Sequence, residues 1–525
     1  MIYFDNSATS PIDEEVLDAM IPYLKEEYGN PSSKYYCKAI NAKAAVDNAR
    51  ANVAKLLGAS EEEIVFTSGA TESTNFIIKG YMDYRRFYED GKNHVITSNS
   101  EHKATLNTCK FLNGELYSNN DPTVGLMGEK VLIDRGYEVS FIPVSRIGEI
   151  EAASVEKSIK NNTALASFIY VNNEVGTINN IKELAEICKS RDVKIHSDLT
   201  QALGKLRINV SDLGLDFASC SAHKIYGPKG IGAAFLKSDA YGIPPITALL
   251  HGGEQEYGLR AGTLAVHNIV GFGKAAEIAL RDMDNTEKHI KRMDEYALRK
   301  LQEIEEVELC NPTEKRIPGI ISILINKTNF HNERFIKKVS DQLAISSGSA
   351  CSAGEPSYVI KAMGLEKKVT KVLRITINKH TSKEDIDQLV TIISNTIWVT
   401  RKQGENMDSS EKTMKQECFV NTLSRLRESS KTAVVSANFS DPYTMYMHVN
   451  RPVQEKFVSV LKNTYNTNHS ELILLCGSVG DGKSHMLSYC KQTYPEMMES
   501  FYVHNDSTAS LYIDKPASYT LMKIM

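Results

Sequence analysis

Short apolar runs alternate with amphipathic stretches from the start of the chain to about residue 402. Four of these runs have the length and composition of buried strands: 63–66, 94–97, 166–170 and 194–197. Residues 181–191 and 280–307 carry apolar side chains at roughly helical spacing among charged ones, so we predict helices there. This alternation predicts an α/β protein with a largely parallel sheet.

A second pattern of strands and helices begins at the apolar run 319–325, and a polar stretch without periodicity follows residue 400. We therefore predict a division into four parts. They are a large domain at 1–260, a small α/β domain at 261–400 with which N-terminal residues can also pack, a linker at 401–417, and a segment at 418–525.

Composition places the chain among ordinary globular proteins, with 42% apolar and 24% charged residues. A net charge of -4 gives no general attraction to nucleic acid or to a membrane surface. The sequence has neither an apolar run long enough to span a bilayer nor the basic and apolar regions of a signal peptide, so a cytoplasmic location is expected. The nine cysteines are scattered without a Cys-x-x-Cys pair, which argues against a zinc knuckle or a disulfide framework.

One lysine has the surroundings of a cofactor site. Hydroxyl and imidazole groups of Ser221 and His223 precede Lys224, and glycines follow it. A single lysine is usually a solvated charge. Upstream, residues 67–73 follow a strand and open a predicted helix, where free N–H groups can hold a phosphate, although a plain helix cap is the simpler interpretation.

Two further residues follow predicted strands. Asp198 lies at the end of a strand, where a carboxylate can pair with a pyridinium nitrogen. His102 lies just after another strand, where an imidazole can stack on a ring and move protons. Taken singly, the first is more often a turn residue and the second a structural histidine.

In combination, six motifs resemble the class V aminotransferase group, and within it the cysteine desulfurases of the IscS/NifS type. The motifs are Ser68-Gly69-Ala70-Thr71-Glu72-Ser73, Glu101-His102-Lys103, Asn172-Asn173-Glu174-Val175-Gly176, Asp198-Leu199-Thr200-Gln201, Ser221-Ala222-His223-Lys224 and Arg260-Ala261-Gly262-Thr263. The resemblance covers about the first 400 residues. It implies the fold of type I pyridoxal-phosphate (PLP) transferases, a homodimer with active sites at the subunit interface, and L-cysteine as substrate.

The resemblance also implies a role for each matching residue. Lys224 becomes the Schiff-base lysine, and Asp198 the partner of the ring nitrogen. The remaining assignments are Thr71, Ser221 and His223 at the phosphate, Thr263 reaching in from the other subunit, Ala70 at the cofactor, Gln201 at the ring hydroxyl, Asn173 beside cofactor and substrate, and His102 stacked on the ring.

A second motif, at 345–357, surrounds Cys351 with glycine, serine and alanine, so its thiol should be accessible. The family's catalytic segment is similar. Its thiolate attacks the sulfur of bound cysteine, and the mobile loop carries the resulting persulfide to an acceptor protein. About two residues of the IscS-type pattern are missing after Cys351, which affects the reach of the loop. A transient iron–sulfur ligand is a further role for this cysteine.

Arg374 lies in a predicted strand, and two interpretations of it stay open. It can clamp the substrate carboxylate in bidentate fashion, as the family pattern favours, or form a structural ion pair. The predicted reaction starts when substrate displaces Lys224, which then moves protons with help from His102. Cys351 takes the sulfur and alanine leaves.

The C-terminal segment contains a P-loop pattern after an apolar run at 472–476. Its predicted nucleotide-binding residues, for ATP and magnesium, are Gly477, Gly482, Lys483 and Ser484. The run 501–506 is a candidate next strand, but only about 40 residues follow the loop. The segment resembles a truncated start of the DptF family of DNA-phosphorothioation-dependent restriction proteins. Together with a desulfurase it suggests the DndA branch, which supplies sulfur for the DNA backbone. An accidental joining of two genes near Met407 stays open.

The leading hypothesis is therefore a PLP-dependent cysteine desulfurase that feeds DNA phosphorothioation, with nucleic acid involved only indirectly. Sulfur supply for iron–sulfur clusters or thio-cofactors is an alternative, as is a selenocysteine lyase or another class V lyase. From another class, a nucleotide-dependent DNA restriction component could use the desulfurase-like part as a scaffold. The intact set of Lys224, Asp198 and Cys351 favours the enzyme.

Overall fold

The computed structural model describes residues 1–115, 133–239, 242–348 and 356–402, and three short strands near the C-terminus. The chain forms two compact units, one of residues 1–116 and 130–397 and one of residues 117–129 and 398–525. No helix in the described ranges is long and apolar enough to cross a membrane.

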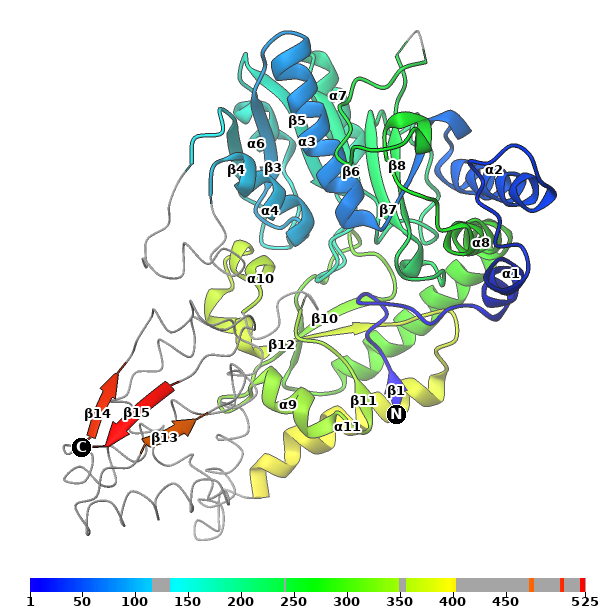
Figure 1. Cartoon of the computed structure of the whole chain (residues 1–525). Coiled ribbons are helices and arrows are strands. Elements are labelled where there is room, and N and C mark those ends of the chain that lie inside the picture. Colours follow the sequence, from blue (N-terminus) through cyan, green and yellow to red (C-terminus); the bar gives the residue numbers. More distant parts are fainter. Residues whose placement is uncertain are drawn as a thin grey trace. The chain divides into compact units, whose positions relative to one another are not determined.

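Seven strands form the main sheet of the first unit, in the order β2-β8-β7-β6-β5-β3-β4 (Figure 1). They are β2 (Ile64–Thr67), β3 (His94–Ser98), β4 (Glu138–Ile142), β5 (Thr163–Ile169), β6 (Lys194–Asp198), β7 (Phe217–Ser221) and β8 (Gly232–Leu236). Six of these strands run in the same direction, and β8 runs opposite to them. The predicted, mainly parallel sheet is confirmed, and each of the four predicted strands has a counterpart.

Successive side chains of the strands enter different hydrophobic cores, because side chains alternate across a sheet. Val65 and Val95 pack with apolar residues of α3 (Ala70–Tyr88) and α4 (Lys103–Leu112). Phe66 and Ile96 belong to the other core. Five helices contribute to that second core: α1 (Glu14–Lys25), α2 (Cys37–Leu57), α6 (Ala152–Ser158), α7 (Ile181–Ser190) and α8 (Val266–Gln302). The sheet is therefore covered on both faces.

Helix α8 differs from its prediction at both ends, since it spans Val266–Gln302 and not 280–307. Gly271 and Gly273 weaken the helical signal of its first turns. A Cβ at Gly271 would lie 2.6 Å from the sulfur of Met20, and one at Gly273 would lie 2.4 Å from Cα of Ala49. The glycines thus permit close packing on α1 and α2, and this packing outweighs their low helix propensity. At the other end, Val307 already pairs with a strand.

A smaller layer holds an antiparallel sheet in the order β12-β10-β9 (Figure 1). Its elements are β9 (Val307–Leu309), β10 (Ile320–Ile325), α9 (Asn332–Val339), α10 (Tyr358–Ala362), β12 (Val372–Thr376) and α11 (Lys383–Lys402). The first strand, β1 (Ile2–Tyr3), pairs with β11 (Leu343–Ala344), so the N-terminus lies in this layer. Because α11 continues to Lys402, the first two residues of the predicted linker at 401–417 are helical.

Besides the end of α11, the described part of the second unit consists of β13 (Leu472–Leu475), β14 (Phe501–His504) and β15 (Thr520–Ile524). Both β13 and β14 pair antiparallel with β15. Strands are therefore present within the two predicted runs at 472–476 and 501–506. The four predicted nucleotide-binding residues, Gly477, Gly482, Lys483 and Ser484, lie outside the described residues.

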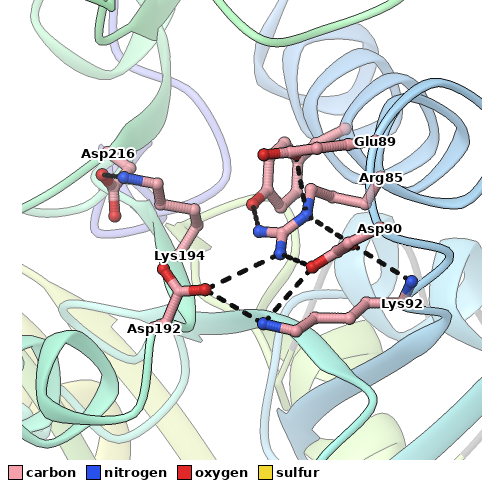
Figure 2. Close-up of polar contacts among 8 residues, drawn as sticks. Arg85, Glu89, Asp90, Lys92, Asp192, Lys194 and Asp216 are labelled. Carbon is pink, nitrogen blue, oxygen red and sulfur yellow. Dashed lines mark hydrogen bonds and ion pairs between the residues drawn. The ribbon is translucent and has the colours of Figure 1, made fainter.

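A network of ion pairs lies in the first unit near the amino ends of β3 and β6 (Figure 2). Arg85 at the end of α3 is nearly buried and pairs with Asp90 at 2.5 Å and with Glu89 at 2.9 Å. The exposed Asp192 lies 3.0 Å from Lys92 and 3.9 Å from Arg85. The network connects the segment before β3 to the turn before β6, at the end of the strands opposite to Asp198.

Candidate active site

Side chains from the carboxyl ends of β6 and β7 and from neighbouring loops line a cavity of about 370 Å³. That volume lies within the usual range for small-molecule sites. Ten residues predicted for cofactor, substrate or catalysis line it: Ala70, Thr71, His102, Asn173, Asp198, Gln201, Ser221, His223, Lys224 and Arg374. The structure thus brings together residues that are separated by up to three hundred positions in the sequence.

Lys224 ends a short 3-10 helix, Ala222–Lys224, directly after β7. Its ammonium group donates to the carbonyl oxygen of Ser7 at 2.5 Å and to that of Ala8 at 2.6 Å. These two carbonyl groups belong to the first residues of the chain, which the sequence analysis did not connect with the site. Nothing in their local pattern indicates this contact, because it depends on how the N-terminus crosses the fold.

An anion site can form where α3 begins. The N-cap residue of this helix is Gly69, which has no side chain to accept hydrogen bonds from the first backbone N–H groups. These N–H groups can therefore bind an anion. A Cβ built on Gly69 would lie 3.8 Å from Oγ of Ser221, which places that hydroxyl beside the helix start. His223 contacts Oγ1 of Thr9 at 3.1 Å, and burial, with Lys224 and Lys229 nearby, lowers the pKa of His223 to about 4.

Asp198 ends β6 and is buried, and one carboxylate oxygen accepts from the backbone of Thr200 at 2.9 Å. Behind it, His196 is fully buried between the hydroxyls of Ser167 and Ser219, at 2.8 and 3.1 Å. Burial lowers the pKa of His196 to about 4, so this ring is neutral. The hydrogen bonds of a neutral imidazole stiffen the strand that carries Asp198.

His102 caps α4, where its Nδ1 accepts from the backbone of Ala104 at 3.2 Å. An Nδ1 that accepts carries no proton, so in the neutral ring the proton lies on Nε2. Nε2 is therefore the ring nitrogen that can donate a proton.

Arg374 is almost completely buried in β12. One nitrogen of the guanidinium donates to the carbonyl oxygen of Asn173 at 2.9 Å, and another pairs with Asp5 at 2.6 Å. Both interpretations from the sequence therefore have a structural basis, since the arginine forms an ion pair and also lines the cavity.

Cys351 lies outside the described residues, as does the rest of the segment 349–355, but described residues on either side of it contact residues at the cavity. On one side, Ser346 and Arg374 exchange backbone hydrogen bonds of 2.7 and 3.4 Å. On the other side, Ser357 donates to the carboxylate of Glu174 at 2.5 Å, and Glu174 follows Asn173 directly. The described residues Ser346 and Ser357, which flank this segment, therefore lie next to residues of the site.

Thr263 is exposed and does not line the cavity within this chain. Its predicted role in the site of another subunit stays a prediction. No sequence motif singles out Lys205, whose ammonium group donates to Oε1 of Gln201 at 2.9 Å. A helical turn after Asp198 brings the two together at a spacing of four residues, a pattern visible in the sequence once the turn is known.

The residues around the cavity fit pyridoxal phosphate. An amine, a carboxylate and a helix N-terminus provide the three kinds of group that its aldehyde, ring nitrogen and phosphate require. Among the residues that line the cavity, three buried polar atoms find no hydrogen-bond partner in the described part of the chain: Oδ1 of Asn173, Oγ1 of Thr200 and Nε of Arg374. All three residues line the cavity, so a bound polar molecule would satisfy them.

Comparison with known proteins agrees with this site. The Aminotransferase class-V family model matches residues 2–118 and 126–389. The cysteine desulfurase IscS of Rickettsia typhi is 38% identical over 405 residues, which cover 76% of this chain and 92% of that protein. Fold and site thus define a PLP protein of the class V aminotransferase type.

Two solved structures resemble the chain. SspA in complex with cysteine is 33% identical, with a TM-score of 0.59, over 73% of this chain and 100% of SspA. DndA from Streptomyces lividans is 30% identical, with a TM-score of 0.57, over 72% of this chain and 99% of DndA. The chain belongs to the cysteine desulfurase family of PLP-dependent enzymes.

Proposed function

We propose that the chain converts L-cysteine to L-alanine and keeps the sulfur as a persulfide on Cys351, for transfer to DNA phosphorothioation. The observation that carries the desulfurase part is the position of the described residues on either side of the Cys351 segment. Ser346 is held by Arg374 and Ser357 by Glu174, next to the cavity that also contains Lys224. A loop that joins these two positions can bring a thiolate into the site and still reach outward.

In this proposal pyridoxal phosphate, when bound, withdraws electrons from the substrate and so weakens its carbon–sulfur bond. Lys224 anchors the cofactor, and Asp198 stabilises a proton on its ring nitrogen. Thr71, Ser221 and His223 bind the phosphate, Ala70 contacts the cofactor, and Gln201 donates to the ring hydroxyl.

Arg374 and Asn173 hold the substrate carboxylate, which orients its sulfur toward the Cys351 loop. Lys224 moves a proton to and from the substrate carbon, with His102 stacked on the ring as a second proton carrier. The Cys351 thiolate then attacks the substrate sulfur. A sulfur–sulfur bond forms, the carbon–sulfur bond breaks, its electron pair takes up a proton, and alanine leaves.

The desulfurase part is tested by measuring alanine and persulfide from L-cysteine with the purified full chain. We expect Cys351→Ala to keep the visible absorbance of the cofactor but to form no persulfide, and Lys224→Ala to lose both absorbance and turnover. A colourless wild type that makes no alanine would refute the proposal. Free selenocysteine as the preferred substrate would favour the lyase alternative.

The similarity to DndA supports the phosphorothioation part, and so does the resemblance of the C-terminal segment to the DptF family. We expect that a host strain without this chain loses phosphorothioate linkages from its DNA, measured by nuclease digestion and mass spectrometry. A Cys351→Ala chain should fail to restore them. Unchanged phosphorothioate together with reduced iron–sulfur enzyme activity would favour the alternative of cluster assembly.

Two finer points belong to the same proposal. The exposed Thr263 is proposed to complete the phosphate site of a partner in a homodimer, which light scattering together with Thr263→Ala can test. ATP and magnesium binding at Gly477, Gly482, Lys483 and Ser484 is tested by isothermal titration with the Lys483→Ala chain as control. Unaltered heats in that variant would contradict the nucleotide site.

A further inference from the structure

A chain of hydrogen bonds joins two lysines of the active site. Lys205 donates to Oε1 of Gln201 at 2.9 Å, and Nε2 of Gln201 donates to the carbonyl oxygen of Ser7 at 3.0 Å. The same carbonyl accepts from Lys224 at 2.5 Å. An ammonium group has only donors, so it identifies the amide atom that faces it as oxygen. Gln201 must therefore point its NH2 group toward Ser7 and the cavity.

The turn after β6 holds Lys205 in place. Backbone hydrogen bonds from Lys205 and Leu206 to Ala202 close this turn, and Gly204 within it has a φ of +68°. A Cβ at Gly204 would lie 2.8 Å from Cγ2 of Ile225, the residue directly after Lys224. The glycine thus allows the turn to pack against the segment that carries Lys224.

Lys205 and Lys224 also line a second, small cavity of about 40 Å³, between the two layers of the first unit. Burial, then the charges of Lys224 and Arg374, lower the pKa of Lys205 to about 7, so Lys205 carries its full charge only below that pH. While it is charged, Lys205 opposes protonation of Lys224 in return, because like charges repel each other. The other charged groups at this cavity are Lys379, paired with Asp13, and Asp282, paired with Arg281, while Arg374 is paired with Asp5.

We propose that Lys205 is a positioning residue of the active site, which holds the Gln201 amide with its NH2 group toward the cofactor and opposes protonation of Lys224. The inference rests on the proposed function, because Gln201 and Lys224 are its cofactor residues. Both effects lower the proton affinity of the Lys224 nitrogen. A donor at the ring hydroxyl stabilises the anionic form of that hydroxyl, and a nearby cation disfavours an added proton. Lys205 therefore keeps the Lys224 nitrogen unprotonated until it accepts a proton during turnover.

The test is a pH titration of the visible absorbance of the bound cofactor, with the purified full chain. We expect Lys205→Met to move the midpoint upward by about one pH unit, a tenfold higher proton affinity. Lys205→Arg keeps the charge and the hydrogen-bond donors, so its midpoint should lie close to that of the wild type. Lys379→Met removes a cation from the same small cavity that is paired with Asp13, so its midpoint should equal that of the wild type.

A wild-type midpoint in Lys205→Met overturns the proposal. If Lys205→Met does not fold, Lys205→Gln replaces it as the uncharged variant, and failure of both to fold assigns Lys205 to packing and also overturns the proposal. A wild-type chain that binds no cofactor refutes the proposed function itself. A wild type that turns over L-cysteine beside an unshifted Lys205→Met refutes only the role of Lys205.

Discussion

Arg374 and Asp5 form an ion pair of 2.6 Å that joins strand β12 to the first residues of the chain. Asp5 fixes one edge of the guanidinium, and the Nε atom lacks a hydrogen-bond partner among the described residues. The ion pair therefore orients the arginine and leaves donor capacity for a substrate carboxylate.

We predict that Arg374→Lys raises KM for L-cysteine at least tenfold, because an ammonium group cannot replace a planar, two-sided donor. Steady-state alanine formation measures this. Arg316→Lys is the matched control, since Arg316 forms a similarly buried pair with Asp294 at 2.6 Å but does not line the cavity. An unchanged KM in Arg374→Lys, with only stability reduced, would leave the arginine a purely structural role.

Glu101 gives a prediction on stability against pH. Its side chain is fully buried and accepts from Ser98 at 2.7 Å, and its Oε2 has no hydrogen-bond partner among the described residues. Burial, opposed by that hydrogen bond, and the charge of Asp198 raise the pKa of Glu101 well above its usual value. The folded protein therefore keeps the proton, while the unfolded chain releases it above about pH 4.5.

Because the folded pKa is raised, the stability from this proton is complete below the unfolded pKa and is lost as pH rises toward the folded pKa. We predict that Glu101→Gln, a neutral side chain of the same shape, removes this loss of about 1.4 kcal/mol per pH unit. Urea unfolding at pH 5 and pH 8 should give the variant its largest advantage at pH 8. Parallel pH profiles of the two proteins would show that Glu101 is ionised in the fold.

For His196 we predict the opposite dependence of stability on pH. Its folded pKa of about 4 lies below the ordinary value of 6.5, so its contribution is present above pH 6.5 and is lost as pH falls toward 4. We expect the wild type to lose about 1.4 kcal/mol of stability per pH unit from this residue. His196→Gln should show a shallower decline in unfolding free energy between pH 6.5 and pH 4.5. An equal slope would contradict the buried neutral ring.

The network of Figure 2 predicts unequal effects for its members. The side chain of Arg85 is 4% exposed and that of Asp192 is 80% exposed. We expect Arg85→Met to lower the unfolding free energy by about 1 to 3 kcal/mol, because it leaves the buried hydroxyl of Tyr81 without its hydrogen-bond partner. Asp192→Asn should cost less than about 1 kcal/mol, since exposed pairs contribute little and asparagine tolerates the φ of +54° at this position.

Thermal unfolding of the two variants measures the difference. Equal losses would mean that the exposed charge of Asp192 contributes as much to stability as the buried guanidinium of Arg85.

The sequence by itself determined the fold class and most of the candidate site. Alternation of apolar runs and amphipathic stretches is a local property, and it predicted the parallel sheet. The motifs around Thr71, His102, Asp198 and Lys224 follow directly after strands, and the carboxyl ends of parallel strands meet at one edge. The local pattern predicts the site geometry there because parallel strands bring the residues at their carboxyl ends together at one edge of the sheet.

Only the tertiary structure decided the rest. The carbonyl groups of Ser7 and Ala8 reach Lys224, and Asp5 reaches Arg374, through contacts between residues more than two hundred positions apart. The start of α8 depends on packing against Met20 and Ala49, which overrides the low helix propensity of glycine. Such contacts form between distant segments that carry no periodic signal for one another, so no local pattern in the sequence predicts them.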